Sequence, residues 1–247
     1  MVTTRSGRSY GPTVMTTVLP QRRRNPPFRR RPKNVRKGRP IKNRRARKAQ
    51  LGGIPIGCKG PCKTHTVDVI KTVDHMGSGP GLVSNITKGD EFGQREGRRI
   101  RVTRLLLRGK AWLAQNKASV AGSCIMKLWV VKDRRPGSEH VAFSALFDMA
   151  DQEPSTALVK LDYRDRFIIL RDMEIDLHGG KEFRVDEETF NLMVPCNCDV
   201  LFDHNDEGTL STTLENGLIL YYAVTDPSQV IQLTAQCRLY FFDSTVN

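Results

Sequence analysis

The sequence predicts an all-β domain, a sandwich or barrel of eight or nine strands with one short helix, preceded by a disordered basic arm. Apolar and polar residues alternate along the last candidate strand, and turn residues separate the earlier ones. Of the 40 lysines and arginines, 17 lie in residues 1–50, which contain no acidic residue. Residues 51–247 hold the other 23 together with all 26 carboxylates. We therefore expect an arm over 1–50 and a single domain over 51–247.

The arm carries too much like charge to fold on its own. Seven of the 13 prolines lie within residues 1–60, where they remove backbone donors and block helix propagation. Guanidinium groups suit bidentate contacts with phosphate. Only Tyr10 and Phe28 could stack on bases, so binding should be largely independent of base sequence. We expect the arm to bind nucleic acid through its clustered basic residues: Arg22, Arg23, Arg24, Arg29, Arg30, Arg31, Lys33, Arg36, Lys37, Arg39, Lys42, Arg44, Arg45, Arg47 and Lys48.

A basic tail can instead keep a protein soluble or act as a nuclear-import signal. An import signal needs only about five to eight basic residues, and the 17 of the arm exceed that number. Nucleic-acid binding is the favoured interpretation, and it is compatible with import. The expected import signal is split between two clusters: Arg22, Arg23, Arg24, Arg29, Arg30 and Arg31, then Lys42, Arg44, Arg45, Arg47 and Lys48.

The expected strands are short segments of β-favouring residues between clusters of turn residues. In order they cover residues 64–73, 81–86, 99–113, 124–132, 157–162, 167–177, 190–202, 217–225 and 231–242. The last alternates strictly over 12 residues and should bury one face. Residues 139–151 differ, because apolar residues recur there at i, i+4 spacing. We expect a short helix at that point, capped by Ser138 and followed by Pro154.

The strand at 99–113 opens with alternating basic and apolar residues. Alternation places Arg99 and Arg101 on the face opposite Ile100 and Val102. We therefore expect Arg99 and Arg101 to bind DNA together with the arm. The nearby basic residues that could extend this surface are Arg98, Arg104 and Arg108. An outer, water-facing strand would show the same alternation, and both interpretations stay open.

No constellation of residues indicates an enzyme. A P-loop would need Ser or Thr after the lysine, but Ala111 follows Gly109-Lys110. The carboxylates Asp148, Asp151 and Glu153 cluster as a solvated edge would. One spacing could bind zinc through Cys58, Cys62, His65 and His75, although Gly60-Pro61 between the cysteines also makes an ordinary turn. Buried thiols are expected at Cys196, Cys198 and Cys237, and no other cofactor is expected.

Export and membrane insertion are not expected from this sequence. The longest notable apolar run, 218–224, falls far short of a membrane span. The first residues lack the apolar stretch of a secretory signal. Six irregularly spaced cysteines are typical of reduced thiols in a cytosolic or nuclear protein.

Six short motifs in register resemble the geminivirus coat protein. They are CKGPCK at 58–63, KDRRP at 132–136, EPSTA at 153–157 after Asp148, DYRDR at 162–166, EN at 215–216 before LILY, and RLYFFDS at 238–244. The resemblance covers residues 50–247, with a basic arm of the family's kind before it. It implies an eight-stranded viral jelly roll and assembly into a twinned pair of incomplete T=1 icosahedra. It also implies packaging of circular single-stranded DNA, nuclear import through a host receptor, and transmission through an insect-vector receptor.

The segments between these motifs depart from the whitefly-transmitted pattern and favour a leafhopper-transmitted, curtovirus-like relative. Two other classes compete with a capsid protein found in the virion and the host nucleus. A monomeric nucleic-acid chaperone could pair a basic tail with a β-barrel, but a simple OB-like barrel has five strands rather than eight or nine. A nuclease subunit ranks third, because no metal or nucleophile constellation is present.

Overall fold

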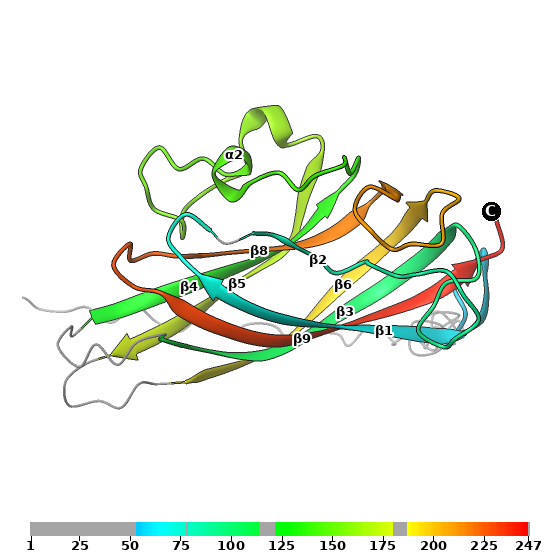
Figure 1. Cartoon of the computed structure of the whole chain (residues 1–247), viewed down its shortest axis with the longest axis horizontal. Coiled ribbons are helices and arrows are strands. Elements are labelled where there is room, and N and C mark those ends of the chain that lie inside the picture. Colours follow the sequence, from blue (N-terminus) through cyan, green and yellow to red (C-terminus); the bar gives the residue numbers. More distant parts are fainter. Residues whose placement is uncertain (1–52, 78, 114–121, 180–186, 247) are drawn as a thin grey trace, which may run out of the picture. The chain divides into compact units, whose positions relative to one another are not determined.

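Nine strands form in the residues that the computed structural model describes, which are 53–77, 79–113, 122–179 and 187–246 (Figure 1). They are β1 (Cys58–Val73), β2 (Gly81–Leu82), β3 (Arg99–Leu113), β4 (Gly122–Asp133), β5 (Phe167–Gly179), β6 (Glu188–Phe202), β7 (Thr213–Glu215), β8 (Gly217–Val224) and β9 (Ile231–Ser244). Two short helices, α2 (Phe143–Leu146) and η1 (Leu161–Tyr163), lie between β4 and β5. The expected arm and all its basic clusters lie outside the described residues.

The strands pair into two antiparallel sheets. The first sheet has the order β1-β9-β3-β6-β7, and the second sheet has the order β2-β8-β4-β5. Apart from β4–β5 and β6–β7, each strand is followed in the chain by one in the other sheet. Setting aside the three-residue β7, the described chain forms two four-stranded sheets with crossing connections, which is the jelly-roll arrangement. The predicted all-β jelly roll is confirmed.

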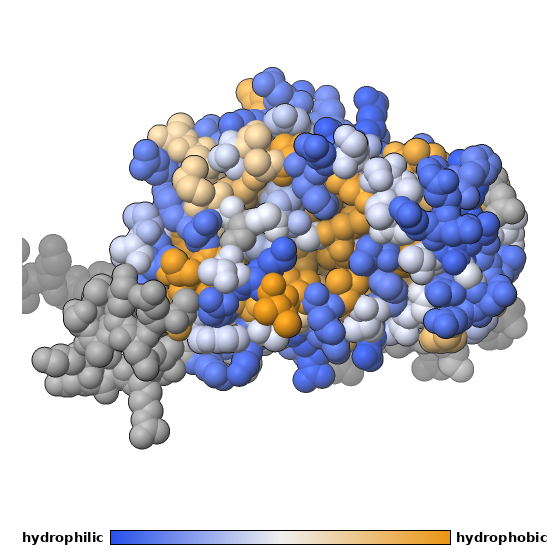
Figure 2. All heavy atoms as spheres, viewed as in Figure 1, coloured by the Kyte–Doolittle hydropathy of each residue, from blue (hydrophilic) through white to orange (hydrophobic). Residues whose placement is uncertain are grey.

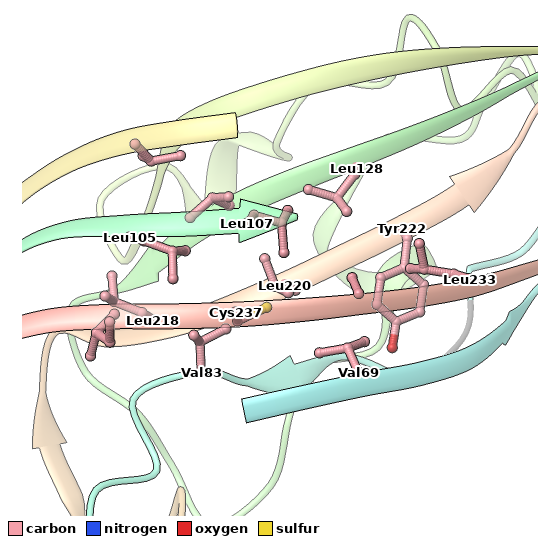
Figure 3. Packing of buried hydrophobic residues seen from close by; sticks show 14 of the residues in the cluster. Val69, Val83, Leu105, Leu107, Leu128, Leu218, Leu220, Tyr222, Leu233 and Cys237 are labelled. Atoms are coloured by element: carbon pink, nitrogen blue, oxygen red, sulfur yellow. The ribbon is translucent and has the colours of Figure 1, made fainter. Parts of the chain in front are cut away.

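Alternate side chains of the two sheets meet in one core (Figure 3). Leu105 and Leu107 of β3 pack there with Leu220 and Tyr222 of β8. The predicted buried thiols are confirmed, because Cys196, Cys198 and Cys237 all lie in this core. Burial raises the pKa of Cys237 to about 12, so this thiol stays protonated and serves as a small apolar side chain.

A second apolar cluster covers the outer face of β8 and β4 in the second sheet. Residues 134–166, here called the cover segment, lie on the side of β8 and β4 away from β9 (Figure 1). The ring of Trp129 on β4 lies 5.3 Å from that of Phe143 and 4.9 Å from that of Phe147. The hydroxyl of Tyr221 on β8 donates to the Val141 carbonyl at 2.9 Å. Both faces of β8 are therefore buried along its whole length.

Two sequence predictions in the cover segment are wrong, and one strand was missed. The helix expected at 139–151 with a Ser138 cap spans only Phe143–Leu146, and its N-cap is Ala142. The strand expected at 157–162 is an isolated bridge between Phe147 and Val159 followed by η1. In both places apolar side chains pack against the second sheet. This packing holds the segment in position without a regular pattern of backbone hydrogen bonds. The missed strand, β7, is a three-residue edge beside β6.

Candidate nucleic-acid interface

The outer face of the first sheet carries a row of basic side chains from β3. Ile100 and Val102 are fully buried, so alternation sends Arg99 and Arg101 outward, as predicted. A one-residue bulge between Val102 and Arg104 then keeps Arg104 on the outward side. We call the outward side chains of β1, β9, β3 and β6 the basic face. Its basic residues are Arg99, Arg101, Arg104, Arg108, Lys110 and Arg238.

Most of these cations have a neighbour that orients them. Arg101 forms an ion pair with Asp199 of β6 at 3.0 Å. The guanidinium of Arg104 lies 4.3 Å from the centre of the Tyr240 ring on β9. Such contacts hold the cations at fixed positions while leaving donors directed to solvent.

The remaining pairs follow the same pattern. Lys110 pairs with Glu187 at 3.0 Å and lies 5.0 Å from the centre of the Trp112 ring. Arg238 donates from Nε to the Thr66 hydroxyl at 3.3 Å. By contrast, Arg99 and Arg108 have no ion pair or hydrogen bond with any side chain in the described part of the domain. Within the described residues, the guanidinium groups of Arg99 and Arg108 are thus the ones without such a side-chain partner.

The two sheets differ in what lies over them. The cover segment buries the outer face of β8 and part of that of β4, whereas the outward residues Asp68, Ile70, Arg108 and Gln236 of the first sheet are exposed. No segment among the described residues covers the basic face in the way residues 134–166 cover β8 and β4. Arg98, in contrast, donates from Nε to the Phe202 carbonyl at 3.2 Å and so supports the fold.

A charged network fixes the start of β1, the part of the domain nearest in sequence to the arm. Lys63 is buried and lies 2.9 Å from Asp243 and 3.0 Å from Glu96, and Lys59 also pairs with Glu96. Burial acts to lower the pKa of Lys63, but its hydrogen bonds to Asp243 and Glu96 outweigh this and raise it. Hydrophilic residues gather at this end, where β1 begins and β9 ends (Figure 2). Sequence reasoning missed this network, because nothing in the chain distinguishes Lys63 from other lysines.

The structure does not bring the four candidate zinc ligands together. Cys58 opens β1, whereas His75 follows its other end and lies within 3.0 Å of the Val224 carbonyl. His65 is hydrogen-bonded to Asn85 at 3.1 Å. In the described residues, no group of three or more His, Cys, Asp or Glu side chains is placed to hold a metal ion. A four-ligand site at Cys58, Cys62, His65 and His75 is thus wrong.

The carboxylates at the end of the expected helix organise their own turns. Asp148 accepts a hydrogen bond from the Ala150 amide, and Asp151 accepts from the Glu153 amide and the Thr156 hydroxyl.

No helix within the described ranges is both long and apolar enough to cross a membrane.

The chain is similar to known proteins over most of its length. Residues 3–247 match the model of the geminivirus coat protein/nuclear export factor BR1 family. The capsid protein of Bean golden yellow mosaic virus (isolate Puerto Rico) is 32% identical over 194 residues, covering 78% of this chain and 77% of that protein. The capsid protein of Abutilon mosaic virus (isolate West India) is 32% identical over 201 residues, covering 81% and 80%. A solved structure of Broad Bean Stain Virus aligns at a TM-score of 0.31 with 10% identity, covering 78% of this chain and 96% of that one.

Proposed function

The chain belongs to the geminivirus coat protein family and is a non-enzymatic capsid protein, and from this premise we propose that it packages circular single-stranded DNA and carries it into the nucleus. In this proposal the arm and the basic face bind the DNA, and copies of the domain form the shell around it. The particle is a twinned pair of incomplete T=1 icosahedra. A host import receptor reads the arm, and an insect-vector receptor reads the outside of the particle.

The observation that carries the DNA-binding proposal is the contrast between the sheets. Residues 134–166 cover the outer face of β8 and β4 in the second sheet, while the first sheet presents a row of exposed or partly exposed cations, of which Arg99 and Arg108 are unpaired among the described residues. An exposed guanidinium suits bidentate phosphate contacts. The remainder beyond the arm has 23 basic and 26 acidic residues, so domains can pack side by side without large repulsion.

An assembly experiment tests the packaging proposal. Full-length protein mixed with circular single-stranded DNA should form large particles that protect the DNA from nuclease. Protein that remains monomeric by analytical ultracentrifugation at physiological salt, with or without DNA, would contradict the proposal.

A double variant tests the basic face specifically. Arg99→Ala with Arg108→Ala should lower the log-log salt slope of DNA binding by about 1.4, since each lost phosphate contact removes about 0.7. Arg171→Ala is the matched control, because Arg171 is exposed on β5 in the other sheet. Equal slopes for the double variant and the control would remove the basic face from the proposal.

The import proposal rests on the accessibility of the arm's two basic clusters when they are not bound to DNA. Phosphate binding and receptor binding would compete for the same side chains, so free subunits import best. A fluorescent fusion in which Arg22, Arg23, Arg24, Arg29, Arg30, Arg31, Lys42, Arg44, Arg45, Arg47 and Lys48 are changed to alanine should lose nuclear accumulation. Full accumulation of this variant would place the signal in the domain.

A further inference from the structure

A shallow groove, largely open to solvent and with a volume of about 510 Å³, crosses the basic face. Two neighbouring rungs of the first sheet form it. Ile70, Thr234 and Lys110 make one rung, from β1, β9 and β3. Asp68, Gln236 and Arg108 make the next rung on the same three strands.

The two walls of the groove differ in chemistry. On the β1 side, Ile70 is 73% exposed and offers an apolar surface beside the Asp68 carboxylate. On the β3 side stands Arg108, whose guanidinium has no partner among the described residues. Thr234 and Gln236 of β9 lie between the two walls. An apolar surface, a hydrogen-bond acceptor and a cation with no partner among the described residues therefore lie around one hollow.

Asp68 is held in place as an acceptor. The Gln236 amide donates from Nε2 to Asp68 Oδ1 at 3.2 Å. An ionised carboxylate can only accept, and because Asp68 is exposed its remaining lone pairs are open to the donors of a ligand. Lys110 is less available to a ligand than Arg108, because it pairs with both oxygens of Glu187 at 3.1 and 3.0 Å.

We propose that this groove binds one nucleotide of the packaged DNA and prefers cytosine to thymine. The inference rests on the proposed DNA-packaging function and adds a site to it. The phosphate lies at Arg108, the base lies against Ile70, and the base edge faces Asp68. Cytosine presents an amino donor at N4, where thymine presents the O4 acceptor. Asp68 therefore gains a hydrogen bond from cytosine and meets an unfavourable acceptor in thymine.

Binding of short labelled oligonucleotides to the full-length protein tests this preference. Fluorescence anisotropy should show oligo(dC) binding about fivefold more tightly than oligo(dT) of equal length, the effect of about one hydrogen bond. Asp68→Asn should remove most of the difference without changing the salt slope, because an amide can also donate to thymine O4. Asp176→Asn is the matched control, since Asp176 is exposed on β5 of the second sheet. It should keep the full preference.

The outcomes separate this inference from the packaging proposal. Equal affinity for the two oligonucleotides, or a preference that survives Asp68→Asn, overturns the groove proposal, and a steep salt dependence in the same titration leaves packaging intact. Failure to bind either oligonucleotide overturns both.

Photocrosslinking locates the base. An oligonucleotide with a single 5-iododeoxycytidine should give adducts in peptides from β1 or β3, and adducts confined to residues 1–50 would contradict the site.

Discussion

The imidazole of His140 in the cover segment is partly buried, and its Nδ1 has no hydrogen-bond partner in the described structure. Burial lowers the pKa of His140, Asp133 acts to raise it, and Lys71 acts to lower it. The folded chain thus resists a proton that the unfolded chain accepts near pH 6.5. The unfolding free energy should therefore be independent of His140 protonation above about pH 6.5. It should fall as the pH drops from there toward the lower pKa of His140 in the folded chain.

A substitution of His140 should reduce the pH dependence of the unfolding free energy. We predict that unassembled subunits lose unfolding free energy between pH 7.5 and 5.5, and that His140→Gln loses less over the same interval. Urea titrations at both values measure the difference. The same loss in wild type and variant would show that another group is responsible.

Arg95 and Arg99 show how far single residues can be predicted from sequence. Strand periodicity correctly placed Arg99 outward, because Ile100 beside it needed a buried face. Arg95, four positions earlier, is fully buried and donates to the carbonyls of Ile86, Gly97, Asn205 and Glu207. It joins loops that only the fold brings together, so no local pattern separates it from a DNA-binding arginine. Which cations of the basic face are already paired is likewise a tertiary property.

At the scale of elements, an ion pair closes the base of the cover segment. Asp133 ends β4, and Arg166 immediately precedes β5. The Arg166 guanidinium donates to both Asp133 oxygens, at 2.9 and 2.8 Å, and Asp133 is only 2% exposed. We predict that Arg166→Ala costs about 3 kcal/mol of unfolding free energy, because it leaves a buried carboxylate without its partner.

Arg164→Ala provides the control for this prediction. Arg164 is 69% exposed and pairs only loosely with Asp165 at 3.7 Å, so its loss should cost less than about 0.5 kcal/mol. Chemical denaturation of both variants measures the difference. Equal small losses would mean that the Asp133 pair does not hold the cover segment.

Most strands were predicted correctly, both those with one buried face, such as β3, and β8, which is buried on both faces, whereas β2 covers only Gly81–Leu82 of the strand expected at 81–86. The bounds of β3 match the prediction, and β4, β5, β6 and β9 extend it by a few residues at their ends. Alternation of apolar and polar residues indicates a strand with one buried and one exposed face. The sequence of β8 does not alternate, because the cover segment buries its second face. The apolar run at 218–224 is that strand. The cover segment itself has no dominant period, since its apolar residues fit the surface of the second sheet rather than a ladder.

At the scale of the whole molecule, the basic arm and the basic face should act on the same polyanion. The division of charge between residues 1–50 and 51–247 is a property of the sequence, and by itself it indicates nucleic acid as the partner. The basic face could be predicted only in part. Its cations come from β3 and β9, which lie more than 100 positions apart in the chain and pair in the first sheet.

Deleting the arm separates the two contributions. Seventeen basic residues could neutralise on the order of 17 phosphates, each adding about 0.7 to the log-log salt slope on single-stranded DNA. We predict that the chain lacking residues 1–50 binds DNA with a much smaller slope, set by the few cations of the basic face. A charge-matched control replaces the arginines of the arm with lysine. This control should keep the slope while binding more weakly, since lysine lacks the bidentate fork. Titrations at several salt concentrations measure both variants. An unchanged slope after the deletion would assign DNA binding to the domain alone.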